Sequence, residues 1–364
     1  MTDLKYIVYC TASINSVIFS DNLRGEGRFE RNVLDALVRD GRDVYLTDLK
    51  RFWKSSQDKP ENLGDYADIK DLTNTVFIGH NPPMRLDIPT KCHRYILQWF
   101  NGPDDNADGE FLELVKDNPR SVVGTYNFLL KHKQYESKLG VENVRCIQGP
   151  AVPQVYQTDN FDKPYLLWSS KILWAWMCTP DMSRFLIGLF KWVADVLEKN
   201  PQTKLMFLLG TMGGMETKEE VMDWFWASEV SRPLYRLKDR VGIFYQIDWS
   251  EVFPVLEQTK LIINPHFGYG GPPYEAGAYG IPIILTKNGH PFQGRNKEKM
   301  FPEILEVYEH YSLNEVLPIL NKLYYNRTYY SSVGNAYRNY VEKWGTYSAY
   351  LRQLDEVCGE FGWV

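Results

Sequence analysis

The sequence predicts an α/β fold built from two Rossmann-like domains that face one another across a cleft. Apolar, strand-like runs alternate with amphipathic, helix-like segments in two successive series, a pattern typical of parallel α/β layering. A stretch at 149–164 with three prolines and little periodicity separates the two series and is expected to be a linker. The chain has 364 residues, a length that accommodates about two domains.

The first series starts with an apolar run at Tyr6–Cys10, which predicts a strand. In Arg28–Arg39 the apolar residues are spaced to lie on one face, so an amphipathic helix is expected there, with Gly41 at its end. Further short strands are expected at Asp43–Thr47, Thr75–Gly79, Tyr95–Phe100, Ser121–Thr125 and Val144–Ile147.

The second series repeats this alternation after the linker, beginning with a strand at Tyr165–Ser169 and a long helix at Met182–Lys199. The remaining strands are expected at Lys204–Gly210, Val241–Phe244, Leu261–Asn264 and Pro282–Thr286. The remaining helices are expected at Trp249–Gln258, Pro273–Tyr279, Leu313–Tyr325 and Tyr329–Lys343. Ligands of open parallel sheets bind at the carboxyl ends of the strands, so the cleft is the expected site.

Composition narrows the class of protein. The 41 basic and 46 acidic residues give a net charge of −5, which weighs against duplex DNA as the main partner. No run reaches the roughly 18 apolar residues of a membrane helix, and the N-terminal apolar run is shorter than that of a signal peptide. The five cysteines are scattered without disulfide or zinc spacing. These features predict reduced thiols in a cytoplasmic protein without stable membrane insertion.

The most informative segment is a glycine-rich connection between two expected strands. It contains Gly268, Tyr269, Gly270 and Gly271, then two prolines that start a helix, and Glu275, which is expected in the first helical turn. Exposed backbone N–H groups that lead into the positive end of a helix can cradle a phosphate. The carboxylate can accept hydrogen bonds from sugar or ribose hydroxyls. The alternative is an ordinary connection whose glycines serve close packing.

This segment resembles the signature of retaining nucleotide-sugar glycosyltransferases of the GT-B fold, the glycogen-synthase-like group. Gly268–Gly270, Glu275 and the strand that starts at Gly280 match that signature without gaps. In the family the second Glu of the signature binds the nucleotide ribose, and the resemblance implies this role for Glu275. The first Glu of the signature, which touches the donor sugar, is replaced here by Phe267. The resemblance spans most of the chain and is densest between about 239 and 286.

The region around Gly25, Gly27 and Arg28 is similar to the family's N-terminal glycine turn and first helix. In the family these glycines let the backbone approach the donor phosphate and the acceptor. The resemblance implies a phosphate or acceptor loop here. The alternative is a flexible loop between the first strand and helix, with an exposed arginine.

The family places a Gly-Arg pair and a downstream Lys, which bind phosphate, after the first strand of the second domain. This chain has Ser169, Ser170 and Lys171 there, and it lacks the Arg and the second Lys. Lys171 can neutralise a diphosphate, and the two hydroxyls can add hydrogen bonds. The alternative for Lys171 is a solvated lysine in a loop.

The family's catalytic-face His closes a central strand of the first domain. His80 ends one expected strand, and Asp104 and Asp105 follow another that is the better positional match. Either Asp could act as a base or accept a hydrogen bond from a sugar hydroxyl. The alternatives are a structural His at a strand end and an ordinary turn around the two Asp residues.

The cofactor signatures of other classes are missing. The sequence has no Walker motif and no dinucleotide fingerprint directly after the first strand, which argues against P-loop kinases and NAD enzymes. No cofactor and no metal are expected, because GT-B enzymes generally stabilise the leaving diphosphate with helix dipoles and cationic groups. The aromatic runs at Met222–Trp226 and Tyr324–Tyr330 are expected mostly to pack in the core.

The sequence therefore predicts a glycosyltransferase that moves a sugar from a nucleotide-diphosphate donor to a hydroxyl acceptor, and the resemblance implies retention. The acceptor could be a saccharide, a lipid-linked sugar, a small molecule or a modified DNA base. Residues 1–155 are expected to form the acceptor-side domain, 156–340 the donor domain, and 341–364 a helix packed back across the linker. The alternatives are a phage-type enzyme acting on modified bases in DNA, a non-catalytic nucleotide-sugar-binding protein, and an epimerase or phosphorylase of the same fold.

Overall fold

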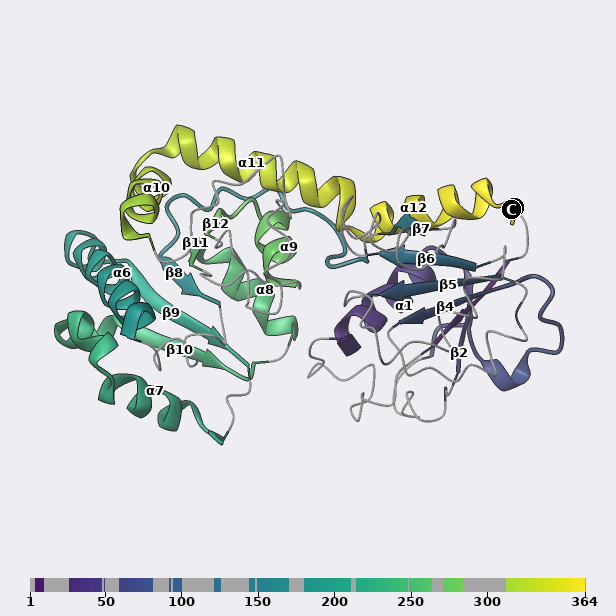
Figure 1. Ribbon diagram of the computed structural model, residues 1–364, viewed down its shortest axis with the longest axis horizontal. Helices are drawn as coiled ribbons and strands as arrows, with labels where there is room; N and C mark the ends of the chain where they lie inside the picture. The colour runs from purple at the N-terminus through teal and green to yellow at the C-terminus, as the bar shows by residue number, and fades with distance from the viewer. Residues whose placement is uncertain are drawn as a thin grey trace. The chain divides into compact units, whose positions relative to one another are not determined.

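The computed structural model describes residues 4–9, 26–47, 49, 59–80, 92, 94–99, 121–125, 144–147, 149–169, 180–210, 214–247, 249–263, 271–284 and 312–363. The chain divides into two compact units, each with its own sheet (Figure 1). Unit 1 comprises Met1–Gln154 and Glu342–Val364, and unit 2 comprises Val155–Val341.

Unit 1 contains a seven-stranded parallel sheet with the order β3-β2-β1-β4-β5-β6-β7. Its strands are β1 (Lys5–Val8), β2 (Asp43–Leu46), β3 (Leu63–Asp65), β4 (Thr75–His80), β5 (Arg94–Trp99), β6 (Ser121–Thr125) and β7 (Val144–Cys146). A short 3-10 helix, η1 (Tyr66–Asp68), follows β3. Successive strand residues such as Ile7 and Val8, which point to opposite faces, are both buried, as expected for a parallel sheet that is covered on both faces.

Two helices from opposite ends of the chain share one hydrophobic core with this sheet. These are α1 (Glu26–Arg39) and α12 (Tyr347–Glu360). Arg42, directly before β2, ties the two ends together by a bidentate pair with Asp355 on α12, at 2.7 and 2.8 Å. The C-terminal helix is thus an integral part of unit 1.

Unit 2 contains a five-stranded parallel sheet with the order β10-β9-β8-β11-β12. Its strands are β8 (Tyr165–Trp168), β9 (Lys204–Leu209), β10 (Val241–Tyr245), β11 (Thr259–Ile263) and β12 (Ile283–Ile284). Its helices are α6 (Pro180–Lys199), α7 (Lys218–Ala227), η3 (Glu229–Arg240), α8 (Trp249–Glu257), α9 (Gly271–Ala278), α10 (Leu313–Tyr325) and α11 (Arg327–Trp344).

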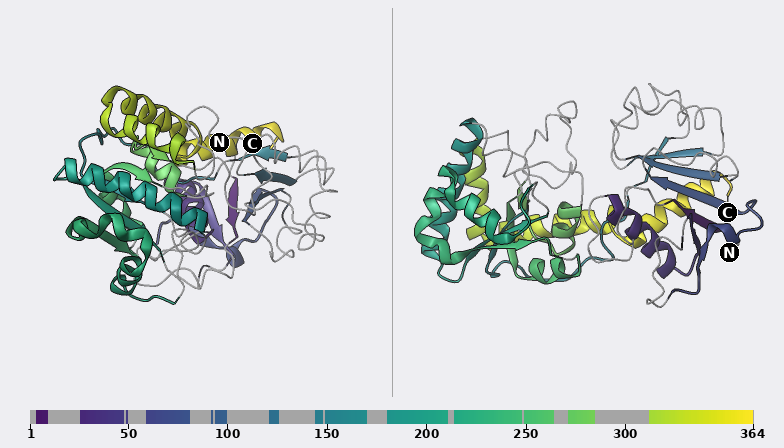
Figure 2. Two further views of the ribbon diagram at one scale, coloured as in Figure 1. Left: turned by 60° about the vertical axis from the view of Figure 1, so that its left-hand side comes forward. Right: turned by 90° about the horizontal axis from the view of Figure 1, so that it is seen from below.

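Helices cover both faces of the unit 2 sheet. The buried residues of α6, α7 and α10 form one core with every second strand residue, such as Leu166, Trp168 and Phe207. On the other face, Tyr337 of α11 donates a hydrogen bond to the Ile283 carbonyl, and α8 and α9 pack nearby through Phe253 and Tyr279. Figures 1 and 2 show α6 and α7 on one side of the sheet and α8 and α9 on the other.

The architecture confirms the predicted α/β class with two Rossmann-like parallel sheets. Core packing is also confirmed for the aromatic runs, because Phe225, Tyr324 and Tyr330 are buried, whereas Tyr325 is exposed. β3 was not expected from the sequence. None of the described helices has the length and apolar character needed to cross a membrane.

Candidate functional site

The strand order of unit 2 contains one topological switch point. β8 and β11 are neighbours at the centre of the sheet, and the chain leaves them toward opposite edges, to β9 and to β12. The connecting helices lie on opposite faces, α6 in one core and α9 on the other side. Such a switch point opens a crevice outside the carboxyl ends of the two strands, which is where open α/β sheets bind ligands.

Ser169 joins the two strand ends at this switch point. Its backbone N–H donates a hydrogen bond to the Ile263 carbonyl at 3.3 Å, and the residue is buried. This bond continues the pairing of β8 with β11 by one residue and fixes the point from which both loops depart. Ser170 and Lys171, the other expected phosphate-binding residues, lie outside the described residues.

Helix α9 begins at Gly271, two residues earlier than expected, so Glu275 is its fifth residue and not part of its first turn. The helix starts earlier because prolines are well accommodated in a first turn, where no amide hydrogen is needed. Pro272 and Pro273 carry no N–H, so Gly271 alone among the first three residues offers one. The helix end therefore supplies fewer phosphate ligands than the sequence suggested. Gly268, Tyr269 and Gly270 lie outside the described residues, as does Phe267.

Glu275 is a buried carboxyl group, with 3% of its surface exposed. It lies between Tyr274 and Ala276, which are buried as well. A buried carboxylate needs hydrogen-bond donors around it, and it can accept two hydroxyl hydrogens. Ser169 follows β8, and the helix that carries Glu275 follows β11, so both belong to connections that leave the same switch point.

The position of α9 depends on close packing against α11. A Cβ on Gly277 would lie 2.5 Å from Val341, so only glycine fits there. Gly280 ends α9 with a φ of +64° and with the two hydrogen bonds of a Schellman motif, in which Ile281 N–H donates to the Ala276 carbonyl. Arg338 of α11 donates to the Tyr279 carbonyl at 3.2 Å. Gly277 and Gly280 therefore serve the close packing of α9 against α11.

Gln246 is a further candidate for a ligand-binding residue, and the sequence analysis did not predict it. It follows β10 at the same edge of the sheet and has a φ of +54°, the left-handed region, which is uncommon for a residue other than glycine. Its N–H donates to the Leu209 carbonyl at 2.9 Å, which holds this conformation. No sequence pattern marks such a residue.

Unit 1 has an equivalent switch point between β1 and β4, where the Tyr9 N–H donates to the Ile78 carbonyl at 2.9 Å. His80 is the last residue of β4 and pairs with Gln98 of β5, so it reaches this edge. Gly27 and Arg28 lie in the first turn of α1, which begins at Glu26, and not in a loop. Gly25, Asp104 and Asp105 lie outside the described residues.

Glu30 is a second buried carboxyl group that the sequence analysis gave no functional role. It precedes Val33, Leu34 and Leu37 on the core-facing stripe of α1, close to the helix end that follows β1. A carboxylate at the i position of an i, i+3, i+4, i+7 apolar pattern is the sequence signal that could have found it.

Among the described residues of unit 2, the lysine with the most strongly shifted pKa lies away from this edge. Lys260 is the second residue of β11, and burial lowers its pKa to about 8. Among the described residues, no three His, Cys, Asp or Glu side chains gather as metal ligands would.

No protein-family model matches this chain, and no curated protein matches it in sequence. Its fold does match solved structures. A sucrose-phosphate synthase (tll1590) from Thermosynechococcus elongatus is 13% identical with a TM-score of 0.62, and a glycosyltransferase from Rickettsia africae ESF-5 is 11% identical with a TM-score of 0.59; each match covers 99% of both chains. A putative UDP-N-acetylglucosamine 2-epimerase from Listeria monocytogenes is 12% identical over 99% of this chain and 97% of that chain, with a TM-score of 0.54. These likenesses show that the chain has the GT-B fold.

Proposed function

We propose that this protein is a glycosyltransferase that moves a sugar from a nucleotide-diphosphate donor to a hydroxyl acceptor. The observation that carries the proposal is the switch point of unit 2, where the β8 end with Ser169 is bonded to the end of β11, the strand that leads to α9 and Glu275. The GT-B neighbours include proteins described as a sucrose-phosphate synthase and a glycosyltransferase, which supports the same class of reaction.

The donor is proposed to lie over the carboxyl edge of the unit 2 sheet. The positive end of α9 and the N–H of Gly271 favour the diphosphate. Because Pro272 and Pro273 provide no amide hydrogen, the remaining negative charge needs a cation, and Lys171 with the hydroxyls of Ser169 and Ser170 is the proposed source. The carboxylate of Glu275 is proposed to accept hydrogen bonds from the nucleotide ribose.

The acceptor side is proposed to be unit 1, with Gly25, Gly27, Arg28, His80, Asp104 and Asp105 as candidate contacts. In the reaction the bond between the anomeric carbon and the diphosphate oxygen breaks, and a bond from that carbon to the acceptor oxygen forms. The acceptor proton passes to a base or to the departing diphosphate. Retention of configuration is part of the proposal.

The first test is a thermal-shift panel of nucleotide sugars on the wild type, Glu275→Gln and the matched control Glu198→Gln. Glu198 lies on an exposed position of α6, so its variant should respond like the wild type. A donor at 100 times its Kd adds about 2.7 kcal/mol of stability. The proposal expects one nucleotide series to stabilise the wild type and the control, and Glu275→Gln to lose that response. No response to any nucleotide sugar would refute it.

The second test separates transfer from the other activities known for this fold. Incubation with the binding nucleotide sugar, followed by NMR of the products, shows whether the sugar is released or transferred, and with which anomeric configuration. A released or transferred α-anomer from an α-linked donor supports a retaining transferase. An altered sugar still attached to its nucleotide supports an epimerase, and an unchanged donor supports a protein that only binds.

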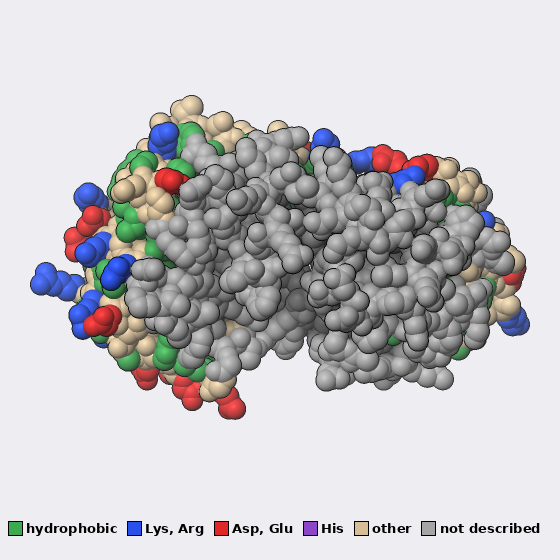
Figure 3. Space-filling view, in the orientation of Figure 1, with side chains coloured by type: hydrophobic (Ala, Val, Ile, Leu, Met, Phe, Trp, Pro, Cys, Tyr) green, Lys and Arg blue, Asp and Glu red, His purple; other side chains and the backbone are tan. Residues whose placement is uncertain are grey.

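The alternative of an enzyme acting on bases in DNA gains no support from the described residues on the face drawn in Figure 3. On the face drawn in Figure 3, the described Lys and Arg side chains are interspersed with Asp and Glu side chains. A DNA-binding face would instead gather basic residues along a strip.

A further inference from the structure

The linker through which the chain enters unit 2 is attached to the C-terminal end of α9. Tyr156, the second residue of unit 2, donates its N–H to the carbonyl of Ala278, the last residue of α9, at 2.8 Å. The Thr158 hydroxyl donates to the Tyr279 carbonyl at 2.9 Å. The rings of Tyr156 and Tyr279 are stacked, with centroids 4.4 Å apart and planes at 15° to one another. Two hydrogen bonds and one ring contact therefore hold the linker on α9.

Arg338 of α11 joins these two parts of the chain. Its Nε donates to the Tyr156 carbonyl at 2.9 Å, and its Nη2 donates to the carbonyls of Thr158 and Tyr279 at 3.1 and 3.2 Å. One guanidinium group thus binds two carbonyls of the linker and one at the end of α9. Because these bonds share one rigid, planar group, the linker and the end of α9 are held in one fixed arrangement.

The guanidinium lies directly against the turn that ends α9. A Cβ on Gly280 would lie 2.3 Å from Nη2 of Arg338, so the glycine leaves the space that the guanidinium occupies. The Nη1 of Arg338 donates to the Asn335 side chain at 2.9 Å, one turn earlier on α11, which orients the group toward α9. Arg338 is therefore held in place by its own helix and is closely fitted to the end of α9.

The length of α9 connects this end of the helix to the proposed donor site. The helix has eight residues, which corresponds to about 12 Å at 1.5 Å per residue, and Glu275 is its fifth residue. A helix this short moves as one body, so a displacement of its C-terminal end also displaces Glu275. The contacts of Arg338 therefore bear on the position of the carboxylate that is proposed to bind the nucleotide ribose.

We propose that Arg338 is a positioning residue that couples the linker to the donor site through α9. This inference rests on the proposed function, because it requires the donor to bind at α9. A donor that fixes α9 also fixes the linker carbonyls that are bonded to Arg338. Coupling between two sites is reciprocal, so a linker that is fixed on α9 strengthens donor binding by the same factor.

The test follows hydrogen exchange of the Tyr156 amide, because its bond to Ala278 breaks when the linker separates from α9. Exchange of the full chain is measured with and without the nucleotide sugar that gives the largest thermal shift. In the wild type, the bound donor should slow exchange about fivefold or more. In Arg338→Lys a single ammonium cannot replace the planar fork, so the donor should slow exchange less than about twofold. The donor Kd should weaken by the factor that is lost.

A second pair of variants removes a single hydrogen bond, and a third variant is the matched control. Thr158→Val removes the hydroxyl bond to Tyr279 and should reduce the donor-dependent protection of Tyr156, whereas Thr158→Ser keeps a hydroxyl and should behave like the wild type. Arg240 also donates from one guanidinium to three carbonyls, around the end of α6. Arg240→Lys should therefore lower the melting temperature and leave the donor-dependent protection of Tyr156 unchanged.

The outcomes separate this inference from the proposed function. If a nucleotide sugar raises the melting temperature of the wild type but leaves exchange at Tyr156 unchanged, the coupling is refuted and the proposed function stands. Equal donor-dependent protection in the wild type and Arg338→Lys would overturn the role of Arg338. If no nucleotide sugar changes the melting temperature, the proposed function fails and the coupling fails with it.

Discussion

Gly334 of α11 and the carbonyl oxygen of Gly280 are in direct backbone contact: a Cβ atom on Gly334 would overlap that oxygen. Gly280 is held in a left-handed conformation at the end of α9, so its carbonyl cannot turn aside without breaking the helix cap. The helix that carries Glu275 is thus fixed from its C-terminal end by a glycine 54 residues further along the chain.

We expect Gly334→Ala to lower the free energy of unfolding by about 1–3 kcal/mol, because the added methyl group meets backbone and not a flexible side chain. Urea denaturation measures this change. Ser331→Ala, on an exposed position of the same helix, is the control and should change stability by less than about 0.5 kcal/mol. An alanine at 334 that leaves stability unchanged would show that α11 can move away from α9 at little cost.

Lys260 gives a pH-dependent prediction. Its Nζ lies 3.9 Å from the ring centroids of both Phe161 and Tyr324, and 7% of the residue is exposed. Burial lowers its pKa from 10.5 to about 8, while Asp162 opposes and Arg327 adds to this shift. Between these two pKa values the unfolded chain holds a proton that the folded chain has released, so stability rises with pH in this window.

The measurement is urea denaturation of the wild type and Lys260→Met between pH 7 and pH 11. The difference, wild type minus variant, should grow in favour of the wild type from pH 8 to pH 10.5 and be flat below pH 8. Subtraction removes the contributions of titrating groups that both proteins share. A constant difference across the range would mean that Lys260 keeps its ordinary pKa.

The parts of the fold that repeat a pattern were predictable, and the parts fixed by single contacts were not. The bounds of α10 and β6 agree with the sequence prediction because apolar spacing and turn residues mark both ends. β3 was missed because Leu63–Asp65 has no apolar run, and its pairing depends on Gly64, where a Cβ would lie 2.6 Å from the Tyr45 ring.

The same holds for the candidate site. The strands along the chain and the glycine-rich connection could be read from the sequence, and Ser169 and Glu275 were proposed from them. The early start of α9 and the left-handed Gln246 could not, because each results from local backbone geometry that many sequences could adopt. Glu30 was not predicted as a site residue, because Val33, Leu34 and Leu37 on the same side of α1 already indicate a core-facing helix.

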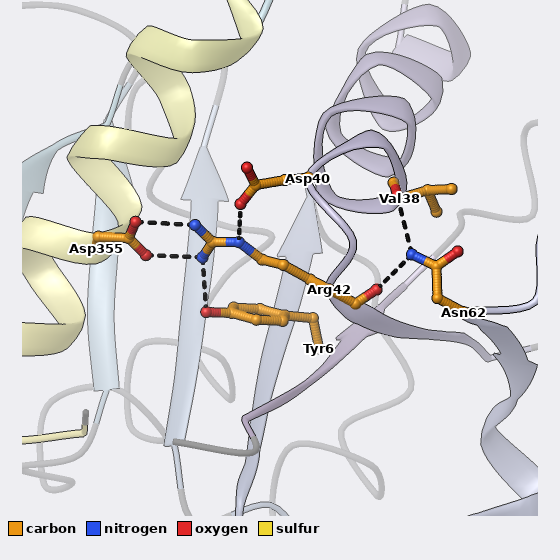
Figure 4. A network of polar contacts seen from close by, with 6 residues as sticks. All are labelled: Tyr6, Val38, Asp40, Arg42, Asn62 and Asp355. Atoms are coloured by element: carbon orange, nitrogen blue, oxygen red, sulfur yellow. Dashed lines mark hydrogen bonds and ion pairs between the residues drawn. The ribbon is translucent and has the colours of Figure 1, made fainter. Parts of the chain in front are cut away.

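The guanidinium of Arg42 donates to Asp355, Asp40 and the Tyr6 hydroxyl (Figure 4), and this branched set of bonds, the Arg42 fork, gives a prediction about the attachment of α12. The side chain of Asp355 is 53% exposed and that of Arg42 15%, so solvent partly screens the attraction between them. The stabilisation therefore depends more on the bidentate geometry of the hydrogen bonds than on the charges alone. We expect Arg42→Lys to lower the free energy of unfolding by about 1–2 kcal/mol, because a single ammonium cannot serve Asp355, Asp40 and Tyr6 together. The control is Arg232→Lys, whose pair with Glu229 is an exposed i,i+3 contact and should cost less than about 0.5 kcal/mol. Equal losses in the two variants would mean that the fork adds nothing to a plain ion pair.

Ser169 allows stability and donor binding to be separated. Its backbone N–H bond to Ile263 does not involve the side chain, so Ser169→Ala keeps the strand ends joined and removes only the hydroxyl. On the proposed function, that hydroxyl donates to the donor diphosphate, and a hydrogen bond to a charged group contributes about 1.5–3 kcal/mol. We therefore expect a nucleotide-sugar Kd at least about tenfold weaker, measured by titration calorimetry, with a melting temperature close to that of the wild type. Ser231→Ala is the control and should lower stability without changing the donor affinity. The buried Ser231 hydroxyl donates to the Ser228 carbonyl at 2.9 Å, and this residue is far along the chain from β8. If Ser169→Ala binds the donor as tightly as the wild type while Glu275→Gln does not, the diphosphate lies against α9 without reaching the β8 end, and Lys171 becomes the group to test next.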